Sequence, residues 1–68
     1  LIDMKPIVHY TKSEFYQGED DIGEPYMFAR VYALDHPKLG EEDIRTSKII
    51  KFIAEGEFET MNTIYVKV

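Results

Sequence analysis

Cysteine is absent from this chain of 68 residues. Its absence excludes disulfides and zinc sites built from thiolates. A domain of this size buries only about 60% of the surface that its unfolded chain exposes, and disulfides, a metal or a partner subunit usually add to its stability. We therefore expect good packing or association with further copies to stabilise it, and a reducing intracellular compartment is compatible with the composition.

Long apolar runs are also absent. No stretch approaches the roughly 20 apolar residues of a membrane span, and no basic segment is followed by the apolar segment of a signal peptide. We expect a cytoplasmic protein with no membrane partner. Met4-Lys5-Pro6 is typical of a natural start, so we expect one domain over residues 4–68 and take Leu1-Ile2-Asp3 as left from cloning or from an upstream reading.

Basic residues are few, since eight lysines and arginines face thirteen acids and the net charge is −5. This balance disfavours general attraction to nucleic-acid phosphates. The acids gather in two clusters, which are Glu19, Asp20, Asp21 and Glu24, and Glu41, Glu42 and Asp43. Lys48, Lys51 and Lys67 lie in the carboxy-terminal part, so a local basic face can coexist with the acidic total.

Motifs for chemistry are missing as well. The two histidines, His9 and His36, are not spaced as metal ligands, and residues 20–23 lack the alternating oxygen ligands of a calcium loop. No glycine-rich phosphate loop occurs, and nothing marks Ser13 or Ser47 as an activated nucleophile. We therefore expect no enzyme activity, no cofactor and no metal, and we interpret His36 as a turn residue before Pro37.

Strand patterns account for most of what is present. Residues 7–10 follow Pro6 as a short apolar run that favours an edge strand, and residues 14–17 predict a single helical turn. Residues 18–25 form a glycine-, proline- and acid-rich loop. In residues 26–34 large and small side chains alternate with a period of two, which predicts a strand, and residues 35–40 predict a turn in which Gly40 is free to take positive φ.

The carboxy-terminal third predicts a β-hairpin between Ser47 and Val68. We favour a three-residue loop over residues 55–57, which places Phe52 opposite Thr60 and Ile50 opposite Asn62; a two-residue loop shifts the pairing by one. The longer loop gives one apolar face, assigned to the core: Ile50, Phe52, Phe58, Ile64 and Val66. The predicted fold is mainly β, a small antiparallel sheet of about four strands, curled or barrel-like, with one short helical turn.

Polar and aromatic side chains in these strands have two interpretations each. We expect Thr46, Ser47, Thr60 and Asn62 to satisfy backbone groups at bulges or strand ends rather than to contact a ligand. Phe28, Phe52 and Phe58 are expected in the core, whereas tyrosines beside basic residues are also typical of a small β-barrel that binds single-stranded nucleic acid. The residues for that alternative are Tyr26, Arg30, Tyr32 and Lys48.

Three short segments carry a resemblance. They are His36-Pro37-Lys38-Leu39-Gly40, Arg45-Thr46-Ser47-Lys48-Ile49 and Phe58-Glu59-Thr60-Met61-Asn62-Thr63-Ile64-Tyr65. This pattern resembles the carboxy-terminal half of small phage- or prophage-encoded proteins of unknown function. The resemblance implies an accessory protein of a bacterial virus that acts in the host cytoplasm, and it implies no catalytic residue.

Our leading prediction for function is a non-enzymatic interaction module that assembles with itself into a homo-oligomer. The small size and the second face of the hairpin lead to it, with the interface residues Ile49, Ile53, Met61 and Tyr65. One alternative is the nucleic-acid-binding barrel described above. The other is an acidic decoy that occupies the nucleic-acid site of a host protein with Glu19, Asp20, Asp21, Glu41, Glu42 and Asp43.

Overall fold

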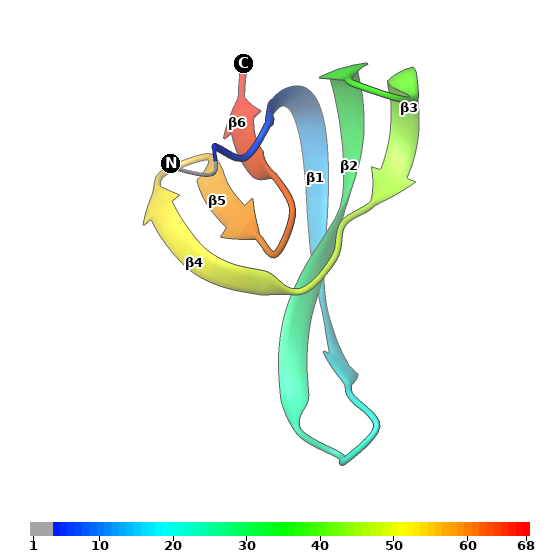
Figure 1. The fold of residues 1–68 in the computed structure, drawn as a ribbon, viewed down its shortest axis with the longest axis vertical. Helices are drawn as coiled ribbons and strands as arrows, with labels where there is room; N and C mark the ends of the chain where they lie inside the picture. The colour runs from blue at the N-terminus through cyan, green and yellow to red at the C-terminus, as the bar shows by residue number, and fades with distance from the viewer. Residues whose placement is uncertain (1–3) are drawn as a thin grey trace.

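The computed structural model describes residues 4–68 and is mainly β, as the sequence predicts (Figure 1). The segment Leu1-Ile2-Asp3, which the sequence suggests to be extraneous, lies outside the described residues. Six strands follow one another along the chain: β1 (Ile7–Glu19), β2 (Pro25–His36), β3 (Gly40–Arg45), β4 (Ile49–Ala54), β5 (Glu57–Thr60) and β6 (Ile64–Lys67). None of the described residues is helical, so the predicted helical turn at residues 14–17 is wrong.

All six strands belong to one open sheet with the order β3-β2-β1-β6-β5-β4. It consists of two antiparallel three-stranded meanders, β1–β2–β3 and β4–β5–β6, joined where β1 runs parallel to β6. The predicted sheet of about four strands, curled or barrel-like, is therefore wrong in strand number and in closure. Closing the sheet into a barrel would require β3 to pair with β4, and these two strands are not paired. The chain leaves β2 after Thr46, whose N–H donates to the Ala29 carbonyl, and β4 then forms the other edge of the sheet.

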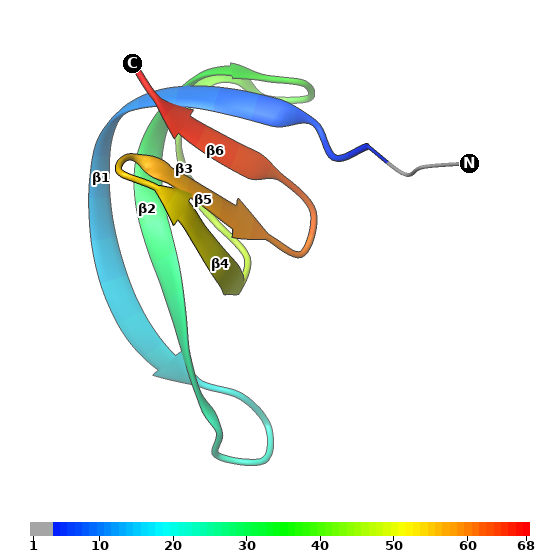
Figure 2. The same ribbon diagram turned by 90° about the vertical axis from the view of Figure 1, so that its left-hand side faces the viewer.

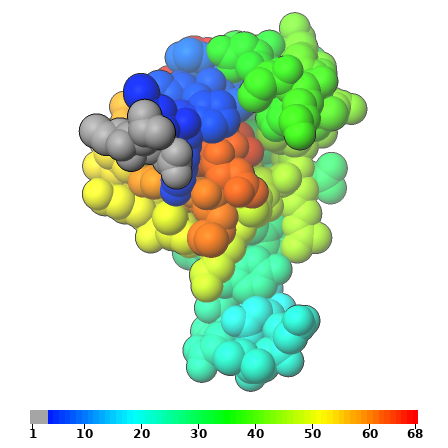
Figure 3. Space-filling model, viewed as in Figure 1, coloured from blue at the N-terminus to red at the C-terminus, as the bar shows by residue number. Residues whose placement is uncertain are grey.

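Strand β1 lies in the middle of the sheet, so the prediction of a short edge strand at residues 7–10 is also wrong. It pairs with β6 over residues 7–10 and with β2 from Tyr10 to Glu19. Beyond Glu14 and its partner Arg30, where the pairing of β2 with β3 ends, β1 and β2 form a two-stranded ribbon, called the arm below, which projects from the rest of the molecule (Figures 1 and 3). Residues 14–17 are strand because they pair with β2 at the base of this arm and within it.

The strand and turn expected between residues 26 and 40 are confirmed. β2 covers the predicted residues 26–34, and residues 37–39 form the turn to β3. The Nδ1 atom of His36 accepts hydrogen bonds from the N–H groups of Lys38 and Leu39, so this histidine is the predicted turn residue. Gly40 has a φ of 68°, in the region that favours glycine.

The predicted carboxy-terminal hairpin is in fact a three-stranded meander. A two-residue turn at Glu55 and Gly56 joins β4 to β5, and Phe52 lies opposite Phe58 rather than Thr60. Ile49 lies opposite Thr60, and one extra residue on β4 follows each of Ile49 and Phe52. These two bulged residues, Ile50 and Ile53, shift the register in a way that side-chain alternation does not reveal.

The core lies between the two meanders, where β1 bends and the β4–β5–β6 meander packs against its concave side (Figure 2). Its buried apolar residues are Val8, Tyr10, Ala29, Val31, Ala33, Ile44, Ile49, Phe58 and Tyr65. The predicted core face is therefore correct for Phe58 but wrong for Ile50 and Phe52, which are exposed, and Ile64 and Val66 are only half-buried. The new register turns Ile49 and Tyr65 inwards in their place.

Two buried threonines, Thr46 and Thr60, bond backbone groups through their hydroxyls, as predicted. The Thr46 Oγ1 accepts a hydrogen bond from the Ala29 N–H. The Thr60 Oγ1 donates to the Thr63 carbonyl and accepts from the Thr63 N–H, which closes the turn between β5 and β6.

Within residues 4–68 no helix is long and apolar enough to cross a membrane.

Candidate functional site

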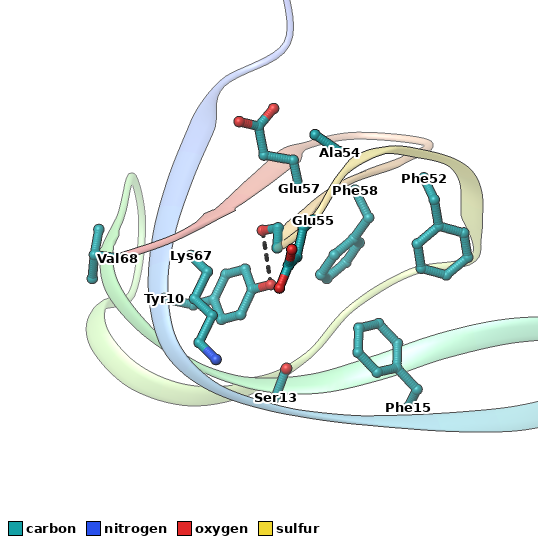
Figure 4. Close-up of a pocket in the computed structure, with 11 residues that line it drawn as sticks. Tyr10, Ser13, Phe15, Phe52, Ala54, Glu55, Glu57, Phe58, Lys67 and Val68 are labelled. Carbon is teal, nitrogen blue, oxygen red and sulfur yellow. Dashed lines mark hydrogen bonds between the residues drawn. The ribbon is translucent and has the colours of Figure 1, made fainter.

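A groove of about 540 Å³ opens between the arm and the β4–β5 turn (Figure 4). Three phenylalanine rings line it: Phe15 from β1, Phe52 from β4 and Phe58 from β5. The Phe15 ring centre lies 5.9 Å from that of Phe52 and 5.5 Å from that of Phe58. Phe58 is buried, whereas Phe15 and Phe52 are 44% and 55% exposed. We call the groove lined by these three rings the aromatic groove. Its two outer rings, Phe15 and Phe52, stay in contact with water unless another molecule covers them.

The polar end of the groove is structural. The Tyr10 hydroxyl donates a hydrogen bond of 2.9 Å to the Gly56 carbonyl, which also accepts from the Lys67 N–H. Burial raises the pKa of the Tyr10 phenol, and a hydrogen bond with Ser13 offsets part of that effect. A neutral phenol that already donates to the backbone is suited to holding strands together rather than to proton transfer.

Beside the groove, β4 forms a free edge of the sheet. Every residue of β4 after Ile49 is exposed, including Ile50, Phe52 and Ile53. We call these three side chains and the free strand the β4 edge. A free edge leaves backbone N–H and C=O groups without strand partners, and apolar side chains on it make it a template for another strand.

The opposite edge, β3, is protected in the way that natural sheets commonly use. It carries Glu41, Glu42 and Asp43 in succession, so a second strand approaching it meets three carboxylates. The Tyr32 hydroxyl donates to Glu41, and this hydrogen bond is the main reason why the pKa of Tyr32 is raised. The two edges therefore differ: the carboxylates of β3 disfavour pairing with another strand, whereas the exposed apolar side chains of the β4 edge favour it.

The four predicted interface residues fall into two groups. Ile53 and Met61 are 43% and 60% exposed and remain available to a partner. Ile49 and Tyr65 are buried in the chain's own core, so their assignment to an outer face was wrong. Phe15, Ile50 and Phe52 were not among the predicted interface residues, because the alternation pattern favours a core position for Ile50 and Phe52 and residues 14–17 resemble a helical turn.

Three of the four residues of the nucleic-acid alternative share a face. Tyr26, Arg30 and Tyr32 project to the same side of β2, as the alternation predicts. Lys48 instead precedes β4 and lines a groove between the first residues of β2 and β4, which it shares with Tyr26 but not with Arg30 or Tyr32. Arg45, opposite Arg30, joins that face in its place.

The six residues of the acidic-decoy alternative do not form one surface. Glu19, Asp20 and Asp21 lie at the tip of the arm, whereas the β3 carboxylates lie at the other end of the molecule (Figure 1). Asp20 is partly occupied by its own loop, because its carboxylate accepts hydrogen bonds from the N–H groups of Ile22 and Glu24. Residues 4–68 contain no group of three or more acidic or imidazole side chains placed to hold a metal ion.

No family model matches this chain, and comparisons with curated proteins and with solved structures gave no match either. The resemblance to small phage-encoded proteins therefore stays a prediction, and any functional argument has to come from the surfaces themselves.

Proposed function

We propose that this protein is a non-enzymatic interaction module that assembles with itself by pairing its β4 edge with the β4 edge of a second copy. The observation that carries the proposal is the contrast between the two edges of one sheet. One edge is lined by carboxylates, and the other presents Ile50, Phe52 and Ile53 beside the aromatic groove.

The charges along β4 favour a second copy as the partner strand. Lys48 directly precedes the strand and Lys51 lies in its middle, whereas Glu55 directly follows its last residue. In an antiparallel pair of two such strands, the basic start of each faces the acidic end of the other at both ends of the contact. The pairing also closes on itself, because one two-fold contact uses the β4 edge of both copies and leaves only the acidic β3 edges free.

Size supports the same proposal. A domain of 68 residues has a small core, and several of its apolar side chains stay exposed on one side. We expect pairing at the β4 edge to cover Phe52, which lies on that edge and forms the outer side of the aromatic groove.

Light scattering coupled to size exclusion tests the proposal at micromolar concentration. We expect a dimer for the unchanged protein and a monomer for Ile53→Lys, because a buried lysine at the contact is unpaired. The matched control is Ile22→Lys at the tip of the arm, which makes the same change at an 83% exposed position away from β4. A strict monomer at the highest concentrations, or an Ile53→Lys variant that dimerises like the control, contradicts the proposal.

Charge exchange tests the antiparallel geometry separately. Lys48→Glu makes both ends of β4 acidic and Glu55→Lys makes both ends basic, so each variant alone is expected to dimerise weakly. Mixed in equal amounts, they should recover association as a heterodimer. If both variants are folded and their mixture still does not associate, this strand arrangement is ruled out.

A further inference from the structure

The outer face of the arm and of its base carries an arrangement that self-assembly at β4 does not use. Its side chains come from three neighbouring strands: Tyr16 from β1, Phe28 and Arg30 from β2, and Arg45 from β3. They line a groove of about 310 Å³, and we call them the arginine platform. Tyr16 and Phe15 are consecutive on β1 and point to opposite faces, so the platform and the aromatic groove are separate surfaces.

Three planar groups of the platform form a stack across the strands. The Tyr16 ring lies on the Phe28 ring, with centres 5.5 Å apart and planes 22° apart. The guanidinium carbon of Arg45 lies 4.1 Å from the centre of the Phe28 ring. Phe28 is therefore placed between a tyrosine and a cation, which fixes the Arg45 guanidinium with its N–H groups available and leaves Tyr16 40% exposed.

A glycine keeps this face flat. Gly18 lies opposite Tyr26, and the Tyr26 ring lies across it: a Cβ at Gly18 would come within 3.2 Å of that ring. The Tyr26 ring also packs against Phe28, with centres 6.0 Å apart. The result is an aromatic surface that continues from the platform along the arm.

The two arginines are a like-charged pair, although Arg30 also lines a second groove with Glu14 and Asp43. Arg30 lies directly opposite Arg45 across β2 and β3, and like charges in that position are destabilising. In the described part of the chain neither guanidinium forms an ion pair or a side-chain hydrogen bond, even though Glu14 lies opposite Arg30 on β1. An anion shared between the two guanidinium groups relieves this repulsion and satisfies their donors.

We propose that the arginine platform binds single-stranded nucleic acid, with phosphates on Arg30 and Arg45 and a base stacked on Tyr16. Paired guanidinium groups suit phosphate oxygens, and exposed aromatic rings beside them suit bases. An acidic peptide would use the arginines but would gain little from the stacked rings, so the aromatic component favours nucleic acid. The net charge of −5 makes binding weak and strongly dependent on salt.

Fluorescence anisotropy with a short labelled oligothymidylate at low salt tests the proposal on the full chain. We expect measurable binding with a slope of log affinity against log salt of about −1.4, since each phosphate contact on a single strand contributes about −0.7. Tyr16→Ala should weaken binding about tenfold or more, and Tyr16→Phe should keep most of it. Arg45→Ala should weaken binding and reduce the slope by about 0.7.

Two controls separate this site from general electrostatics. Lys38→Ala removes one positive charge at the exposed β2–β3 turn, outside the platform, and should leave binding nearly unchanged. Arg45→Lys keeps the charge but loses the planar stack, and it should bind more weakly than the unchanged protein; it also serves if Arg45→Ala does not fold. The Ile53→Lys variant of β4 should bind the oligonucleotide as well as the unchanged protein does, whatever its oligomeric state.

Several results overturn the proposal. They are the absence of binding at low salt, equal losses in Lys38→Ala and Arg45→Ala, and unchanged binding in Tyr16→Ala. Binding of labelled polyglutamate with the same affinity as the oligonucleotide would assign the platform to acidic peptides instead. Equal competition by inorganic polyphosphate would reduce it to a phosphate site without base stacking.

Discussion

The carbonyl group of Gly56 connects three parts of the chain. It accepts the Tyr10 hydroxyl from β1 and the Lys67 N–H from β6, each at 2.9 Å, while Gly56 itself forms the turn between β4 and β5. The residue has a φ of 76°, and a Cβ there would lie 3.0 Å from the Lys67 Cβ. Two separate demands, backbone conformation and space, thus require glycine at this one position.

We predict that Gly56→Ala lowers the free energy of unfolding by about 1–3 kcal/mol from backbone strain, with a further loss from the contact to Lys67. Urea denaturation measures it. Gly23→Ala is the control, because Gly23 also has positive φ but has nothing within 4 Å of the added carbon. Equal losses for the two variants would show that the contact with Lys67 has no cost.

Sequence reasoning located Gly56 in a turn but could not choose between loops of two and three residues. The choice depends on which residues of β4 and β5 lie opposite each other, and the bulges at Ile50 and Ile53 allow a register that simple alternation excludes. The threonines were easier to predict, because a hydroxyl buried near a strand end has few other uses than bonding the backbone.

The link between the beginning of β1 and the end of β2 depends on a side chain. The last pair of the β1–β2 ladder is Tyr10 opposite Ala33, and beyond it the Asp35 carboxylate takes the place of a backbone acceptor. One carboxylate oxygen accepts from the His9 N–H at 2.7 Å, and the other lies 2.6 Å from the His9 Nδ1. These contacts lower the pKa of Asp35, mainly through the imidazole hydrogen bond and further through the backbone N–H.

A carboxyl group whose pKa is lower in the folded chain stabilises the fold above its unfolded pKa of about 3.9, and the stabilisation is lost as the pH falls through the folded value. We therefore predict that the melting temperature of the unchanged protein falls more steeply below about pH 4 than that of Asp35→Asn. Thermal melts between neutral and acid pH measure this. As a control, Asp21→Asn removes the same charge from the exposed loop at the arm tip, and its melting temperature should still fall steeply at acid pH. Parallel curves for the unchanged protein and Asp35→Asn would contradict the role of Asp35 in this pH dependence.

Elements differ in how well the sequence predicts them. Strand β2 has one face inside and one outside, so its side chains alternate and its bounds were close to those expected. Strand β1 was predicted over only its first residues, because in the arm it pairs with a single strand and most of its residues are exposed on both faces. Without burial there is no alternation to detect, and residues 14–17 appear as a helical turn.

The whole molecule has two edges of opposite character and two faces for which we propose functions. The β4 edge and the aromatic groove lie on the concave side, and the arginine platform lies on the other face of the arm. A dimer paired at β4 therefore leaves both arginine platforms open. The proposed assembly and the proposed nucleic-acid binding can occur in the same molecule, and variants at either surface can test them separately.

If association contributes to folding stability, the melting temperature must depend on protein concentration. Over a hundredfold range we expect a rise on the order of 5 °C, because binding of the folded partner stabilises only the folded chain and a domain of this size shifts by several degrees per kcal/mol. Differential scanning calorimetry at several concentrations provides the measurement. Ile53→Lys should melt at the same temperature at every concentration. A melting temperature of the unchanged protein that does not depend on concentration would exclude stabilising self-association.

Composition and local pattern were enough to establish a mainly β domain without cysteine, the strand over residues 26–34, the turn at residues 35–40 and the alternation that places Tyr26, Arg30 and Tyr32 on one side. These features depend on neighbours along the chain. The number of strands, the parallel pairing of β1 with β6 and the bulges of β4 depend on contacts between residues far apart in sequence. Because one shifted residue moves side chains to the opposite face, only that long-range pairing could place Ile49 and Tyr65 in the core and leave Ile50 and Phe52 exposed.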